Sequence, residues 1–258
     1  MTGSYFKMTW RTLLKNKVSS FINLSGLTLG LTTSLLIMLV VMDELDYDKF
    51  HTNLPGIHIL MINQSTNDGI STGMSTAGPM AEALRSGFPE VKYAARVSYF
   101  HGEKINISDK ISFESGIYAD PDLFRIMTFP QIEGDAVSAL ESNALVITRD
   151  MAKKLFGNEN ALGRAVVFNN QSLTVGAIIE NITTKSTIRF DMALPFARYE
   201  KENPWLKKWD DNRIMTWMLL QPSVNFSEFD RKITALLQEQ AKDKTVAQFA
   251  YPLQQLHL

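Results

Sequence analysis

The sequence of 258 residues has no cysteine, a formal net charge of only −1, and a single long uncharged apolar run. Without cysteine, the chain has no disulfide, thiolate zinc site, iron–sulfur cluster or thiol nucleophile. The 26 Lys and Arg residues against 27 Asp and Glu lack the basic excess typical of nucleic-acid binders, so we expect no nucleic-acid partner. A hydrophobic content of 45% is that of a folded chain, and the length suits one or two domains.

The long apolar run extends from Val18 to Met42. As a helix, its 22 residues after Ser20 would measure about 33 Å, which matches a hydrocarbon core of about 30 Å. A cleaved signal peptide would have a shorter apolar region followed by small residues and a cleavage site. The sequence therefore predicts one uncleaved transmembrane helix over residues 18–42, in contact with membrane lipid.

The flanks of this span differ in charge. The basic residues before it, which occur with no acidic residue among them, are Lys7, Arg11, Lys15 and Lys17. The stem that follows it contains Asp43, Glu44, Asp46, Tyr47 and Asp48. Because Lys and Arg gather on the cytoplasmic side, we expect a cytoplasmic N-terminus and an extracytoplasmic bulk after residue 42. The acidic residues could gather a cation, but they lack the turn glycine of a calcium loop, which favours a solvated stem.

Residues 1–17 are predicted to form an amphipathic helix on the cytoplasmic interface. Its apolar face would carry Trp10 among other large side chains, with Lys7, Arg11 and Lys15 beside them. Two interpretations remain open: a topology signal with an aromatic anchor, or a docking element for a cytoplasmic partner. Within the span, Gly26, Gly30 and Ser34 recur every four residues, a stripe that would allow close helix packing in the membrane.

The extracytoplasmic part, residues 43–258, is predicted to be an α+β domain with two lobes. A strand over residues 56–65, a helix ending at Gly87 and a strand over 91–100 form one βαβ unit. A strand over 214–221, a helix capped by Asn225 and a strand over 246–256 form another. Together they predict a split, ferredoxin-like lobe built from residues 52–100 and 213–258.

The inserted lobe, residues 101–212, is predicted to be rich in β structure. Its expected strands cover residues 111–118, 144–148, 165–169 and 172–180, with a helix over 149–156. Asn169 and Asn170 would form a hairpin turn. Residues 188–194 alternate in polarity and would pair at a sheet edge, and residues 201–212 would form a surface loop or short helix.

The sequence contains no constellation typical of catalysis. His51, His58, His101 and His257 form no zinc-binding spacing. The segment from Gly157 to Arg164 lacks the spacing and Lys-Ser/Thr of a phosphate-binding loop. We therefore expect no enzyme activity, cofactor or metal site.

The sequence resembles a known permease family over nearly its whole length. Near the span the resemblance is carried by Tyr5 to Lys7, Trp10 to Lys17, Phe21 to Asn23, Gly26 to Gly30 and Asp43 to His51. In the outer part it is carried by Gly78-Pro79, Phe88 to Val91, Tyr118 to Pro121, Phe124, Phe129-Pro130, Gly134-Asp135, Thr148 to Gly157, Leu162 to Arg164 and Leu253 to Leu258. These motifs resemble FtsX/MacB-type ABC transporter permeases of the Bacteroidetes kind.

The resemblance implies a MacB-like periplasmic core domain held in the bacterial inner membrane. It also implies a permease component that transmits motion from a separate cytoplasmic ABC ATPase, for export or extraction of a substrate. Permeases of this family continue into further spans, whereas this sequence ends at Leu258. The expected partners are therefore the remaining permease spans or a second permease subunit, besides the ATPase. The alternative is a stand-alone bitopic binding or sensory protein.

Overall fold

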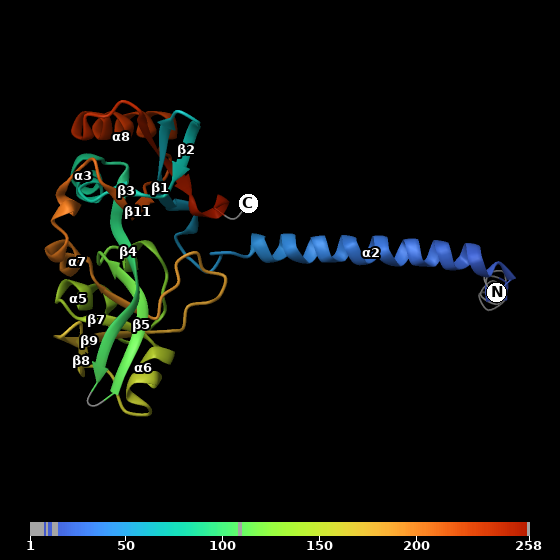
Figure 1. Ribbon diagram of the computed structural model, residues 1–258, viewed down its shortest axis with the longest axis horizontal. Helices are drawn as coiled ribbons and strands as arrows, with labels where there is room; N and C mark the ends of the chain where they lie inside the picture. Colours follow the sequence, from blue (N-terminus) through green and yellow to red (C-terminus); the bar gives the residue numbers. More distant parts are fainter. Residues whose placement is uncertain (1–7, 9, 12–14, 108–109, 257–258) are drawn as a thin grey trace. The chain divides into compact units, whose positions relative to one another are not determined.

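The structure is a computed structural model that describes residues 8, 10–11, 15–107 and 110–256. It divides into two units, a helical one up to Tyr47 and an outer domain over Asp48–Leu256 (Figure 1). The α-helices are α2 (Lys17–Leu45), α3 (Met80–Gly87), α4 (Leu123–Ile126), α5 (Ala136–Glu141), α6 (Arg149–Phe156), α7 (Phe196–Glu202) and α8 (Phe226–Ala241). Short 3-10 helices are η1 (Leu54–Gly56), η2 (Pro204–Lys207) and η3 (Leu253–Gln255).

The outer domain contains one mixed sheet of twelve strands. The first six are β1 (Ile57–Thr66), β2 (Gly69–Gly73), β3 (Thr76–Ala77), β4 (Val91–Ile107), β5 (Lys110–Ala119) and β6 (Gln131–Gly134). The other six are β7 (Leu145–Thr148), β8 (Ala165–Phe168), β9 (Gln171–Ile179), β10 (Met192–Pro195), β11 (Asn212–Leu220) and β12 (Val246–Pro252). With its helices, this sheet confirms the expected α+β class.

Helix α2 contains the predicted span, residues 18–42. It has 29 residues, which corresponds to about 44 Å, and none of its side chains is buried. Within the described residues it is the one helix long and apolar enough to cross a membrane. Its exposed Leu, Ile, Val and Met side chains need an apolar environment, which a bilayer supplies.

Four strands of the outer domain have the ferredoxin-like order. β12, β1, β11 and β4 lie side by side, and each neighbouring pair is antiparallel. In chain order this is 4-1-3-2, the result of two βαβ units whose strands interleave. Helices α3 and α8 connect the strands within the two units, and Figure 1 shows them at the same end of the outer domain.

Alternating side chains give this sheet two apolar faces. Leu60 and Ile62 of β1 pack under α3 and α8, together with Leu84, Phe229 and other buried residues of those helices. Ile57 and Ile59 of β1 point the other way, into a core shared with α4 and α5. Burial on both faces fixes the strand register, because a slip of one residue would exchange the two sets of side chains.

Strand β4 and five further strands close into a barrel. β4 pairs with β5, β5 with β10, β10 with β7, β7 with β9, β9 with β8, and β8 returns to β4. A third core is associated with this ring and contains large residues such as Phe100, Phe168 and Leu194. The turn between β8 and β9 has positive φ at both Asn169 and Asn170, so the predicted hairpin turn is confirmed.

Three features differ from the sequence-based expectations. The segment 188–194 was expected at an edge, but β10 begins only at Met192 and lies inside the sheet, between β5 and β7. Its side chains are buried on both faces, and a four-residue interior strand is too short for its pattern to show this. Strand β4 continues past residue 100 and belongs to both the ferredoxin-like sheet and the barrel. Helices α4, α5 and α7 were not predicted from the sequence.

Candidate functional site

The first residue of the outer domain, Asp48, is fixed by a segment far away in the chain. Its carboxylate accepts hydrogen bonds from the Thr187 backbone N–H (2.9 Å to Oδ1) and from the Thr187 hydroxyl (2.5 Å to Oδ2). Its own backbone N–H donates to the Lys185 carbonyl over 2.9 Å. Asp48 adopts a φ of +57°, a left-handed conformation that Asp tolerates better than most residues. The chain leaving α2 is therefore held by the loop that precedes β10.

His51 joins the same cluster. Its Nδ1 accepts the Thr128 backbone N–H over 3.0 Å, which places the ring proton of the neutral form on Nε2. Nε2 lies 3.6 Å from Asp48 Oδ1, and both side chains are buried. The Thr52 N–H donates to the Thr128 hydroxyl over 2.9 Å. We call Asp48, His51, Thr128 and Thr187 the Asp48 cluster.

This placement corrects the expectation of a uniformly solvated stem. Asp48 is only 1% exposed, whereas Asp43, Glu44 and Asp46 are exposed as expected. Burial raises the pKa of the Asp48 carboxyl, but the hydrogen bonds from Thr187 and the nearby His51 ring outweigh it and hold the pKa below its usual value. The carboxylate is thus ionised, and each oxygen has a donor. It acts as a structural anchor for the domain entrance.

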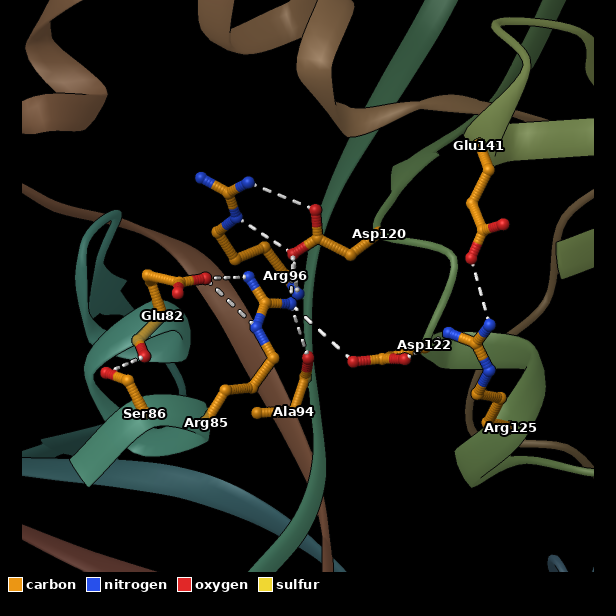
Figure 2. Close-up of polar contacts among 9 residues, drawn as sticks. All are labelled: Glu82, Arg85, Ser86, Ala94, Arg96, Asp120, Asp122, Arg125 and Glu141. Carbon is orange, nitrogen blue, oxygen red and sulfur yellow. Dashed lines mark hydrogen bonds and ion pairs between the residues drawn. The ribbon is translucent and has the colours of Figure 1, made fainter. Parts of the chain in front are cut away.

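A second polar cluster joins the ferredoxin-like sheet to the barrel side of the domain (Figure 2). The guanidinium of Arg96, on β4, binds the Asp120 carboxylate at two points, Nε to Oδ2 at 2.9 Å and Nη2 to Oδ1 at 3.0 Å. The Arg96 backbone N–H donates to the same carboxylate. Arg96 also pairs with Glu200 of α7 at 3.2 Å and lies over the Phe196 ring, 4.2 Å from its centroid.

The cluster extends to α3, α4 and α5. Arg85 of α3 donates to the Ala94 carbonyl on β4 and lies 3.7 Å from both Asp120 and Asp122. Asp122 also accepts from Arg125, which reaches Glu141 on α5 over 2.9 Å. Figure 2 shows Arg85, Arg96 and Arg125 converging on the two aspartates from three elements. We call Arg85, Arg96, Asp120, Asp122, Arg125, Glu141 and Glu200 the arginine network.

The electrostatics of the network favour one fixed arrangement. Burial lowers the pKa of Arg96, but Asp120 and Glu200 raise it by more. The net effect is a raised pKa, so the guanidinium stays charged. The side chains of Arg96 and Asp120 are only 12% and 8% exposed. A buried pair of this kind contributes little over an apolar substitute, yet breaking it by removing one partner is costly. It therefore specifies how β4, the end of β5 and α7 fit together.

The residues singled out in the sequence do not converge on one site. Gly26, Gly30 and Ser34 lie exposed along α2, with no atom within 4 Å of a Cβ built on either glycine. Trp10, Arg11, Lys15 and Lys17 are exposed, and Lys7 lies outside the described residues. Among the histidines, His58 is buried, and this burial lowers its pKa despite a contact from Nδ1 to the Gly56 carbonyl. The described residues hold no group of three or more His, Asp or Glu suited to a metal ion.

Sequence reasoning missed the arginine network. Asp120 belongs to one of the motifs that carry the family resemblance, but its partner Arg96 lies 24 residues away on another strand. No local spacing links Arg85 or Glu200 to it. The single signal was the Asp-Pro dipeptide after β5, which predicts a turn but not an ion pair.

The fold belongs to a known class of extracytoplasmic domains. One similar solved structure is a domain of a putative permease from Porphyromonas gingivalis, 21% identical, with a TM-score of 0.67 over 80% of this chain and 92% of that one. Another is the periplasmic region of MacB from Actinobacillus actinomycetemcomitans, 13% identical, with a TM-score of 0.56 over 76% and 90%. A third is the extracellular domain of the noncanonic ABC-type transporter YknZ from Gram-positive bacteria. It is 14% identical, with a TM-score of 0.56 over 75% of this chain and 98% of that one.

These likenesses show that the chain shares the fold of these three domains. The family model of the MacB-like periplasmic core domain matches residues 20–236, most of the span and most of the outer domain. The chain belongs to this family. Among curated protein sequences, none matches the chain.

Proposed function

We propose that the chain is a component of an ABC transporter permease that carries motion from a separate cytoplasmic ATPase to the outer domain, for export or extraction of a substrate. The observation that supports this most is the family match over residues 20–236, which joins a membrane-length helix to a MacB-like outer domain in one chain. The described residues offer no metal-binding group, and the role proposed is mechanical rather than catalytic.

The Asp48 cluster and the arginine network suit this role. A displacement of α2 reaches Asp48 first, because Asp48 follows the end of the helix by three residues. From there, hydrogen bonds carry it to residues 185–187, and the covalent chain carries it to β1. The arginine network then ties the two parts of the domain together. Rigid transmission needs such non-covalent links, since a stem joined by the chain alone would bend.

The proposed orientation places the N-terminus in the cytoplasm and the outer domain in the periplasm of the inner membrane. A protease added to spheroplasts should digest the chain beyond about residue 50 while sparing α2. Protection of the outer domain would contradict the orientation and the function together.

The proposed ATPase contact can be tested by co-purification from native membranes. We propose that the N-terminal segment with Trp10, Arg11 and Lys15 docks the ATPase, and that further permease spans or a second subunit complete the assembly. An ABC ATPase should co-purify with the chain, and Trp10→Ala should reduce its recovery without changing the membrane level. Val18→Ala is the control. Absence of any ATPase would favour the alternative, a stand-alone bitopic binding protein.

A further inference from the structure

A cavity of about 400 Å³ lies beside strands β4 and β5. Residues that line it come from β4, β5, α6 and the segment between β9 and β10, and include Tyr99, His101, Asp150, Asn181, Arg189 and Asp191. Its size is that of small-molecule sites in proteins. Neither the Asp48 cluster nor the arginine network uses these side chains.

A bulge in β4 forms one wall of the cavity. His101 and Gly102 together face the single residue Ser115 of β5, because the pairing shifts between Phe100 and Glu103. Gly102 has a φ of +68°, which glycine adopts without strain. Bulges redirect side chains, and they are frequent beside binding sites. Here the bulge sets the Tyr99 and His101 rings parallel, with an interplanar angle of 1° and centroids 6.4 Å apart.

Charges of both signs line the same cavity. Arg189 supplies a guanidinium, and Asp150 and Asp191 supply carboxylates. Among the described residues, no ion pair uses any of these three side chains, although they share one cavity. Burial raises the pKa of Tyr99 more than the adjacent Arg189 lowers it, which keeps the phenol a neutral donor. All three side chains are exposed, so their charges are available to a ligand in the cavity.

Polar groups of the backbone and side chains fix the geometry around these charges. The Asp150 backbone N–H donates to Asn181 Oδ1 over 2.9 Å, which joins the first turn of α6 to the segment after β9. Gly116, which also lines the cavity, approaches the Met192 carbonyl so closely that a Cβ would lie 2.4 Å from it. Asp150 lies in the first turn of α6, whereas Arg189 and Asp191 lie in the irregular segment that leads into β10.

We propose that this cavity binds a small zwitterion of amino-acid or dipeptide type. The anionic group would pair with Arg189 and the cationic group with Asp150 and Asp191, while an apolar side chain would lie against Tyr99 and His101. A ligand with only one charge would leave the opposite charges of the cavity unpaired, which reduces its affinity.

Isothermal titration of the full chain in detergent with glycyl-phenylalanine tests this site. We expect saturable binding with a dissociation constant on the order of 1 mM or below. N-acetyl-glycyl-phenylalanine and glycyl-phenylalanine amide should each bind about tenfold more weakly, because each loses one charge-assisted contact. The assay contains no ATPase, so its result is independent of the proposed transport role.

Substitution of Arg189 separates a site from general adsorption. Arg189→Gln should weaken binding of the free dipeptide about tenfold and remove its advantage over the amide, while the advantage over the acetylated form persists. The control Arg231→Gln changes an exposed arginine on α8 and should bind as the parent does. Circular dichroism checks the fold of both variants. The absence of saturable binding, equal affinities for the free and capped dipeptides, or an Arg189→Gln variant that binds normally would overturn the proposal.

Discussion

Arg96 and Asp120 face each other across β4 and the end of β5 in a two-point ion pair, with contacts of 2.9 and 3.0 Å. The same carboxylate accepts the Arg96 backbone N–H, so one side chain holds both the backbone and the guanidinium of its partner. The pair lies where the ferredoxin-like sheet continues into the barrel. Its geometry gives a direct prediction for stability.

Replacing Asp120 by Asn should lower the free energy of unfolding by about 3 kcal/mol, because it leaves the buried Arg96 without its two-point partner. The measurement is urea denaturation of the full chain in detergent, followed by tryptophan fluorescence. Glu141→Gln removes the more exposed partner of Arg125, with 53% of its side chain accessible, and should cost less than about 1 kcal/mol. Equal losses in the two variants would show that burial of the Arg96 pair does not matter.

Asp48→Asn should destabilise the chain at pH 7 by about 1–3 kcal/mol, since an amide has one oxygen and cannot accept from both the backbone N–H and the hydroxyl of Thr187. The folded pKa of Asp48 lies below its ordinary value, so its contribution is complete above the unfolded pKa of about 4 and is lost as the pH falls through the folded pKa. The difference between parent and variant should therefore shrink below about pH 4. Urea denaturation of both proteins at several pH values measures this difference in the free energy of unfolding. A difference that does not change with pH would contradict the prediction.

Gly78→Ala should destabilise the outer domain by about 1–3 kcal/mol, because a Cβ at this position would lie 2.0 Å from the Leu206 carbonyl oxygen. The backbone on both sides would have to move apart. Gly87→Ala is the matched control, since nothing lies within 4 Å of its Cβ and the residue ends α3 in an ordinary conformation. The control should be neutral or slightly stabilising. Thermal unfolding compares the two.

Gly30→Leu is expected to remove close helix packing in the membrane while leaving the apolar anchor intact. In a complete permease that contains this segment, assembly or ATP-coupled transport should be lost without a change in membrane level or topology. Leu31→Ala alters apolarity on another side of α2 and should have little effect. Normal transport in the Gly30→Leu variant would make the span a simple anchor.

Regular local patterns predicted much of the fold. Asn225 accepts from the Glu228 backbone N–H and begins α8, and Phe229, Ile233 and Leu237 form its buried face, as their spacing indicates. β10 was misplaced because alternation over a few residues does not distinguish an edge strand from an interior one. The closure of the barrel by β8 against β4 depends on Ile105 opposite Phe168, a contact that no local pattern specifies.

Local sequence patterns could not predict the two polar clusters either, because the partners in each cluster lie far apart in the chain. Asp48 is one of several acidic residues after the span, and nothing in the local sequence distinguishes it from the exposed ones. It is buried because its hydrogen-bond partner lies elsewhere in the domain. That partner, Thr187, lies 139 residues further along the chain. A threonine that donates hydrogen bonds to a distant carboxylate has no sequence signature. The acidic pattern therefore predicts the stem but not the burial of Asp48.

The attachment of Asp48 to residues 185–187 has a consequence for how such domains can be exchanged during evolution. The region 101–212 is inserted between the two βαβ units, and in sequence it looks like a cassette that recombination could replace freely. Thr187 donates hydrogen bonds to the Asp48 carboxylate, and the Asp48 backbone N–H donates to the Lys185 carbonyl, so this region helps to hold the stem in place. A chimaera that receives this region from a relative must therefore inherit matching residues at 48–51, or its stem loses the support on which it rests.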